Sequence, residues 1–165
     1  MSAILLSVNG IHQLDLSPAI AVIAPIAAKC EAMDVQALTK TQLRFEIDYP
    51  LEPGDPRELS EIPEIRLWFL RLDAEYPWLP IVLDWEAGEL GRYAAMLVPH
   101  QFSAKDGIRY NPEALELFVM GKTFLLLKWM KKNQITRRTR LKFMTQMLGY
   151  ELDDGFFDLL GVQDD

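Results

Sequence analysis

The sequence has little of the chemistry that binds metals or forms covalent cross-links. Its 165 residues include one cysteine, Cys30, and two histidines, His12 and His100. One cysteine excludes an internal disulfide framework. The cysteine and the two histidines are too few, and too far apart in sequence, to supply the ligands of a zinc or iron–sulfur site. We therefore expect no metal and no cofactor of its own, and we expect Cys30 to act as a small buried hydrophobic residue.

Long hydrophobic runs and targeting segments are also missing. The longest weakly polar run, residues 17–28, is shorter than the roughly 20 residues that a membrane-spanning helix needs, and it contains two prolines. The first residues, MSAILLSVNG, lack the basic start of a secretory signal and the arginine of a transit peptide. The expectation is a chain that begins at Met1 and works in the reducing cytoplasm of a bacterium, without direct membrane insertion.

Size and charge favour one acidic globular domain. A chain of this length, 50% hydrophobic, can bury roughly 70% of its extended-chain surface in a single core. The formal net charge of −7 argues against a general affinity for nucleic acid or anionic lipid. The charge is uneven, however, because the segment between Leu117 and Tyr150 has eight basic residues and no acidic one.

Two strands are predicted in the first third of the chain. Residues 3–8 form a short apolar run that ends at the turn-forming pair Asn9–Gly10. Residues 43–49 alternate strictly between apolar and charged side chains, which is typical of a half-buried strand. Between the strands, residues 17–33 are expected to be helical, with Pro25 kinking or dividing the helix.

The middle of the chain predicts one clear helix and less certain strands. A proline-rich loop at 50–56 precedes a helix that starts near residue 60, because apolar residues then recur at helical spacing: Ile65, Trp68, Phe69, Leu72 and Tyr76. Residues 81–83 are compatible with a central strand. Residues 94–98 are apolar enough for another strand, although the segment 84–98 as a whole is open to either helix or strand.

The strongest helix signal begins at Asn111, where an N-cap residue, a first-turn proline and an acidic residue follow one another. This helix should run to about Asn133, and its apolar residues are not confined to one face, which predicts a central or covered helix. Two further helices, 137–148 and 153–160, each ended by a glycine, can supply that cover.

The expected fold is therefore mixed α/β (α+β), with a small sheet and a helical C-terminal half, in a single domain over residues 1–165. Within it, residues 1–49 form a strand–helix–strand part and residues 60–160 form the main body.

An enzyme is one functional hypothesis. Asp84, Glu86 and Glu89 are close in sequence to Trp85, and a pair of carboxylates in different environments can divide the roles of acid and base. His100 could be presented to a ligand after Pro99. Neither pattern is specific, because capping or salt-bridged carboxylates and hydrogen-bonded structural histidines have the same appearance. This hypothesis requires a pocket in which these groups converge.

The basic residues between 122 and 142 suggest a second hypothesis, weak binding of nucleic acid by a helix pair. A solvated basic surface, or a surface that binds an acidic protein, explains the same charges.

Three segments carry a resemblance to a known family. They are EIRLWFLRLDAEYPWLPIVLDWEAGELGRYAAMLVPHQF, IRYNPEALELFVMGKTFLLLKWM and LKFMTQMLGYELDDGFFDLL, and together they cover approximately residues 60–160. These strings resemble the chlororespiratory reduction 6 family of cyanobacteria and chloroplasts, whereas the first 50 or so residues are similar only in general character.

The resemblance implies a non-enzymatic assembly factor for the photosynthetic NAD(P)H dehydrogenase-like complex. In that family the factor is associated with the peripheral arm, and specifically with the ferredoxin-like iron–sulfur subunit I. The resemblance supplies no catalytic residues, and it implies a cyanobacterial cytoplasm or, for a relative, the chloroplast stroma. From exposure arguments we expect the partner-binding residues to be the following: Arg92, Pro99, His100, Phe102, Lys128, Lys131 and Arg138.

Overall fold

The structure, a computed structural model, describes residues 2–31, 41–103 and 107–161, with side chains for all of these except 29–31, 101–103 and 107–108. The side chain of Cys30 thus lies outside the described residues. The elements, in order, are β1 Ser2–Ser7, α1 Val8–His12, α2 Ser17–Glu31, β2 Leu43–Asp48, η1 Leu59–Glu61, α4 Pro63–Glu75, η2 Leu79–Val82, α5 Glu89–Leu97, β3 His100–Ser103, β4 Gly107–Tyr110, α6 Pro112–Lys132, α7 Thr139–Met147 and α8 Asp154–Leu159.

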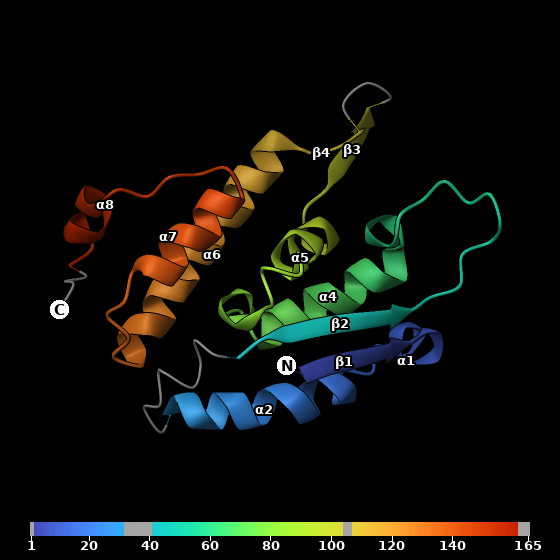
Figure 1. Cartoon of the computed structure of the whole chain (residues 1–165), viewed down its shortest axis with the longest axis horizontal. Helices are drawn as coiled ribbons and strands as arrows, with labels where there is room; N and C mark the ends of the chain where they lie inside the picture. Colours follow the sequence, from blue (N-terminus) through green and yellow to red (C-terminus); the bar gives the residue numbers. More distant parts are fainter. Residues whose placement is uncertain (1, 32–40, 104–106, 162–165) are drawn as a thin grey trace.

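The mixed α/β single-domain fold is confirmed. Strands β1 and β2 pair in parallel, with Ser2 opposite Leu43 and Ser7 opposite Asp48. Strands β3 and β4 form a separate antiparallel hairpin. Figure 1 shows α2 alongside β1, and α4 and α5 beyond β2, while the C-terminal helices α6, α7 and α8 lie to one side of this arrangement.

The parallel sheet buries one face, as the alternation in the sequence predicts. Ile4 and Leu6 of β1 and Leu43 and Phe45 of β2 are buried, whereas Leu5 is 64% exposed. Because side chains of a strand alternate between the two faces of a sheet, the register places all four buried residues on the same face. The other face carries the charged residues of β2 and remains open to solvent.

Helix α4 lies at the centre of the hydrophobic core. All four of its predicted apolar positions before Tyr76 are buried: Ile65, Trp68, Phe69 and Leu72. The Phe69 ring packs edge-on against Phe45 of β2, with ring centroids 5.0 Å apart. The indole Nε1–H of Trp68 donates to the carbonyl oxygen of Asp15 at 2.8 Å, so the buried ring keeps its polar group satisfied.

The start of α6 follows the predicted capping pattern. The Asn111 side-chain oxygen accepts from the N–H groups of Glu113 and Ala114 at 3.1 and 3.3 Å, and Pro112 occupies the first turn. Glu113 in the first turn and Lys131 and Lys132 in the last turn complement the helix dipole. The boundaries agree with the prediction to within a residue.

The expected strand at residues 94–98 is wrong, and the helical alternative for this region is correct. Gly88, in a left-handed conformation with φ of 79°, precedes α5 as its N-cap. Leu90, Tyr93 and Ala94 are buried, and their spacing of three and four is helical, but a window of five residues is too short to show it. The segment 81–83 is not a full strand either, because only Leu83 forms a β-bridge, to Leu43.

Two local features near the N-terminus also differ from expectation. The pair Asn9–Gly10 is not a turn between strand and loop but lies in the short helix α1, which is capped by Ser7: its Oγ accepts from the Gly10 N–H at 3.2 Å. Helix α2 continues through Pro25 without dividing. Pro25 and Ala21, whose carbonyl the proline leaves without an intrahelical donor, are both exposed, so water can satisfy that carbonyl.

Candidate partner-binding surfaces

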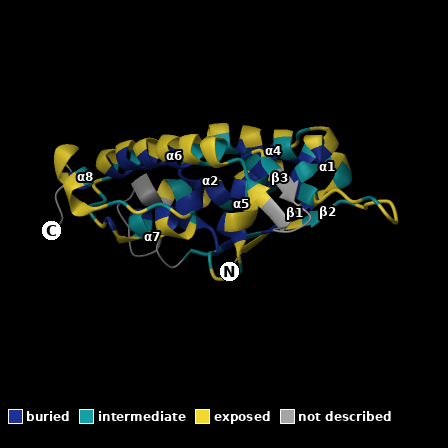
Figure 2. Ribbon diagram, turned by 90° about the horizontal axis from the view of Figure 1, so that it is seen from above, coloured by how far each residue is buried: buried dark blue, intermediate teal, exposed yellow. Residues whose placement is uncertain are grey.

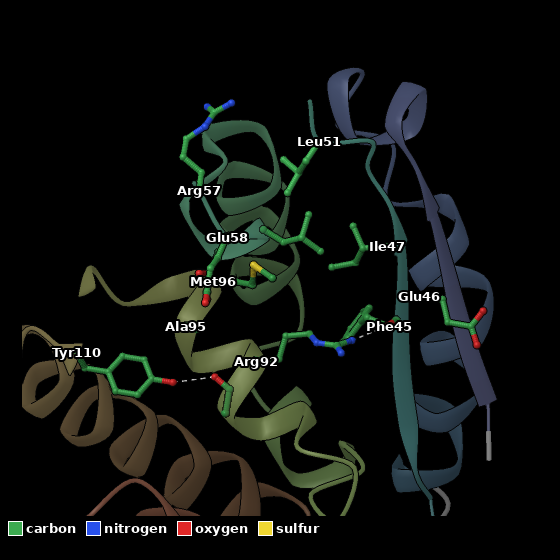
Figure 3. Close-up of a pocket in the computed structure, with 13 residues that line it drawn as sticks. Phe45, Glu46, Ile47, Leu51, Arg57, Glu58, Arg92, Ala95, Met96 and Tyr110 are labelled. Carbon is green, nitrogen blue, oxygen red and sulfur yellow. Dashed lines mark hydrogen bonds between the residues drawn. The ribbon is translucent and has the colours of Figure 1, made fainter. Parts of the chain in front are cut away.

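A groove of about 900 Å³ separates β2 from η1 and α5. Its walls are mainly apolar, and Figure 3 shows the side chains of Ile47, Leu51 and Met96 facing a shared space. At one end, the Tyr110 hydroxyl donates to the Gly91 carbonyl oxygen at 2.9 Å and so ties β4 to α5. A concave, mostly apolar surface with a few polar groups at its edge is a common form of binding site.

Arg92, one of the predicted partner-binding residues, lines this groove, but its guanidinium is already engaged. Its Nη1 donates to the carbonyl oxygen of Phe45 at 2.8 Å and lies 3.0 Å from Glu89 Oε1. Glu89 Oε2 in turn accepts from the Phe45 N–H at 3.1 Å. The two side chains therefore hydrogen-bond to the edge of β2 that faces away from β1, where a third strand would otherwise pair.

Two of the four residues named by the enzyme hypothesis lie together beside this edge. Asp84 accepts from Arg44 Nε at 3.0 Å and from the Ala87 N–H at 3.1 Å, and its own N–H donates to the Leu43 carbonyl at 3.0 Å. The Glu89 N–H donates to the Asp84 carbonyl oxygen at 3.1 Å. Both carboxylates are thus used to hold the segment after η2 against β2.

The environments of these carboxylates differ. Burial opposes ionisation of Asp84, but hydrogen bonds from Ala87 and Arg44 and the charge of Arg44 outweigh it and lower the pKa of Asp84. Burial raises the pKa of Glu89, against the opposing effects of the Phe45 N–H and of Arg92. Their partners are backbone groups and arginines of the fold, so the contrast in pKa has a structural cause.

His100 does not join these carboxylates. It follows the exposed Pro99 but lies in β3 and is not presented to a ligand. The His100 side chain is 2% exposed, with its Nε2 3.4 Å from Ser60 Oγ and 3.7 Å from Glu61 Oε1. It ties the hairpin to η1 and offers little surface to a partner. Phe102 also lies in β3, and its side chain is outside the described residues.

The predicted basic surface is smaller than the sequence indicates, because four of its eight basic residues contact other parts of the chain. Lys122, 4% exposed, pairs with Asp73 of α4, and Arg140 donates to the Ile81 carbonyl oxygen at 2.6 Å. Lys142 pairs with Asp154 of α8. The remaining exposed basic residues are Lys128, Lys131, Lys132 and Arg137.

Arg138 was expected to bind a partner but is 5% exposed. Its guanidinium lies 5.2 Å from the centre of the Phe157 ring, 3.3 Å from Asp158 Oδ1 and 3.5 Å from Asp154 Oδ1. These contacts attach α8 to the start of α7. The sequence could not show this, because the acidic partners follow Arg138 by 16 and 20 residues and lie beyond a helix and a turn.

Helix α6 is not covered on all sides, contrary to expectation. Leu117, Met120 and Phe124 are 66%, 49% and 48% exposed. Figure 2 shows the exposed side of α6 running along the top of the molecule beside α4. Helices α7 and α8 therefore do not cover this side, and the only ring that α8 places beside it is Phe156, 6.2 Å from the centre of the Phe124 ring.

Within residues 2–31, 41–103 and 107–161, no group of three or more histidine, cysteine, aspartate or glutamate residues is placed to hold a metal ion. None of the helices in these ranges has the length and apolar character needed to cross a bilayer.

An apolar groove and an exposed apolar helix face are surfaces on which a protein partner can bind, and Asp84 and Glu89, the two predicted catalytic groups that lie together, are engaged with β2. Comparison with known families defines the class of protein. The chain belongs to the chlororespiratory reduction 6 family, which it matches over residues 6–159. The match thus includes most of the first 50 residues. The family occurs in chloroplasts and cyanobacteria and is implicated in assembly of the NAD(P)H dehydrogenase-like complex. No solved structure matches the chain.

Proposed function

We propose that this chain binds the ferredoxin-like iron–sulfur subunit I of the NAD(P)H dehydrogenase-like complex and keeps it folded until it joins the peripheral arm. Family membership over nearly the whole chain carries the proposal. The work is non-enzymatic and takes place in the cyanobacterial cytoplasm, or in the stroma for a chloroplast relative. In this proposal the factor is not a subunit of the finished complex, so it leaves once subunit I has docked.

The groove between β2, η1 and α5 is the surface that we propose for this client. Its apolar residues offer an area that an unfinished interface can cover, and Arg92 and Tyr110, the last residue of β4, form part of its walls. Pro99, just before β3, stays part of the proposal as an exposed residue. Lys128 and Lys131 lie elsewhere, in the C-terminal half of α6, and are exposed. Their contribution to client binding is electrostatic attraction during approach, which acts mainly on the association rate.

The structure does not favour the nucleic-acid hypothesis. It required the basic residues between 122 and 142 to share one accessible surface, whereas Lys122 and Arg138 are buried against aspartates. The enzyme hypothesis required Asp84, Glu86, Glu89 and His100 to converge in a pocket. None of these four residues lines the groove.

An affinity pull-down of the tagged chain from a cyanobacterial lysate, at two salt concentrations, tests the function. We expect recovery of subunit I without most of the mature complex. Leu51→Glu places a charge in the groove and should reduce recovery, whereas Leu5→Glu, on the open face of β1, is the matched control. Recovery of only unrelated proteins or nucleic acid by the wild-type chain would reject the proposed client.

If subunit I is recovered equally well with Leu51→Glu and with the wild type, the function stands but the groove is the wrong surface. Lys128→Glu combined with Lys131→Glu should weaken recovery more at low salt than at high salt, since salt screens exposed charges.

A further inference from the structure

The exposed side of α6 carries charges of opposite sign at its two ends. Along one face, the residues at spacings of three and four are Glu113, Leu117, Met120, Phe124, Lys128 and Lys131, and all six are exposed. The N-terminal end of this face is acidic, its centre is apolar and its C-terminal end is basic. We call these six residues the α6 face. It extends over about 27 Å, since a helix rises roughly 1.5 Å per residue.

This order of residues is complementary to itself when reversed. If a second α6 lies antiparallel across the first, centred near residue 122, Glu113 of one copy meets Lys131 of the other. Met120 then meets Phe124, and Glu116 and Lys128 lie at the same height on the two flanks of the interface. Each of these contacts occurs twice, as a two-fold symmetric interface requires.

We propose that the α6 face is the interface of a homodimer, formed by antiparallel pairing of α6 from two copies of this chain. The occupant follows from the charges. A partner surface of one sign would attract one end of the α6 face and repel the other, whereas a second copy in antiparallel orientation attracts both ends. The antiparallel arrangement also opposes the two helix dipoles.

The centre of the α6 face permits close approach. Gly121 lies next to Met120 and is exposed, and a Cβ added there would meet nothing within 4 Å, so the backbone is accessible at this point. A small residue beside Met120 leaves room for a side chain of the second helix at the interaxial distance of about 8–10 Å that such contacts normally have.

The α6 face is presented on a rigid support. On the sides of the helix away from this face, Leu126 and Met130 are buried in the core, and the ion pair between Lys122 and Asp73 ties α6 to α4. The Phe124 ring contacts Phe156 of α8, which restricts its motion. A surface that is ordered before binding loses less conformational entropy on association.

The proposal places Lys128 and Lys131 at the dimer interface, where they are less accessible to the client, so it competes with the role in client approach proposed above. It is therefore tested on the purified chain alone. Light scattering after size-exclusion chromatography, over a concentration series, should show a dimer for the wild type. Met120→Asp should raise the dissociation constant at least tenfold, roughly the cost of burying a charge against an apolar partner. Leu5→Asp, at a site of similar or greater exposure, is the control and should leave the constant unchanged.

Reversing the charges at one end of α6 tests whether the two copies of α6 pair in antiparallel orientation. The variant E113K/E116K has four lysines on this side of the helix, and the variant K128E/K131E has four glutamates. Each alone should be monomeric, because its copies repel, and an equimolar mixture should form a heterodimer. Circular dichroism confirms that both variants are folded.

Three results would overturn the proposal. A monomeric wild type at every concentration would assign the α6 face to another protein. A wild-type dimer that persists in both charge variants would place the interface elsewhere. Variants that stay monomeric when mixed would exclude the antiparallel pairing.

Discussion

A partly buried carboxylate, that of Asp73, connects α4, α5 and α6. The hydroxyl of Tyr93 and the ammonium of Lys122 both donate to Asp73 Oδ1. Tyr93 is 1% exposed and Lys122 is 4% exposed, so neither donor can turn to bulk water. The substitution Asp73→Ala leaves a buried ammonium and a buried hydroxyl without their acceptor, and we expect a large loss of stability.

The magnitude follows from the burial. Removing one partner of a buried ion pair costs about 3–5 kcal/mol, and the Asp73 side chain is 23% exposed, so we expect the lower figure. The unfolding entropy of a chain of 165 residues is about 0.35 kcal/mol/K, which converts about 3 kcal/mol into a fall in Tm of about 9 °C. Adding Lys122→Met removes the unpaired charge and should restore most of the Tm.

Thermal unfolding followed by circular dichroism is the assay, with the single and double variants compared at about pH 7 and about pH 9.5. Burial lowers the pKa of Lys122, opposed by Asp73, and loss of Asp73 should lower it further. The unfolded chain then binds more protons than the folded one at alkaline pH, so stability rises with pH there. The difference in Tm between the two variants should therefore shrink.

Asp48→Ala, which removes an exposed carboxylate on the open face of the sheet, is the control and should leave the Tm nearly unchanged. The reasoning is refuted if Asp73→Ala lowers the Tm by less than about 2 °C, or if the double variant is no more stable than the single one.

Two further substitutions test other parts of the fold. Glu89→Gln keeps an oxygen for the Phe45 N–H but removes a carboxylate whose pKa is raised by burial. Because the pKa is raised, the wild type loses stability as pH rises from 4.5 through the pKa of Glu89 in the folded state. The midpoint of urea unfolding should therefore vary less with pH in the variant. Identical pH profiles of the two proteins would contradict this. Arg138→Glu, at a site 5% exposed between aspartates, should lower the Tm by at least about 9 °C. Lys128→Glu, the same charge reversal at an exposed site, is the control. Equal falls in Tm for the two variants would show that the burial of Arg138 does not matter.

The elements that could be predicted from sequence are those whose signal lies within a few residues. The N-cap at Asn111 and the alternation in 43–49 are local, and both agree with the structure. The hydrophobic spacing of α4 is local in the same way. For α5 the helical signal covers nine residues, and it was obscured because its last residues are a continuous apolar run that is also typical of a strand.

The candidate site could be predicted only in part, because side-chain partners depend on distant segments. Arg92, predicted to bind a partner, lines the groove, and its bond to Phe45 joins residues 47 apart in sequence. The burial of Lys122 depends on Asp73, 49 residues earlier. Sequence periodicity places a residue on one face of its own helix, but it carries no information about which acidic residue the fold brings opposite.

The edge of β2 that faces α5 has a consequence for solubility at high concentration. An open strand edge is a template on which other chains can add, and it is a common starting point for fibres. Here the Asp84 N–H takes the Leu43 carbonyl, and the side chains of Glu89 and Arg92 take both polar groups of Phe45. These contacts close the edge of β2 to a further strand at Leu43 and Phe45. At these two positions β2 therefore offers other chains little backbone template for copolymerisation.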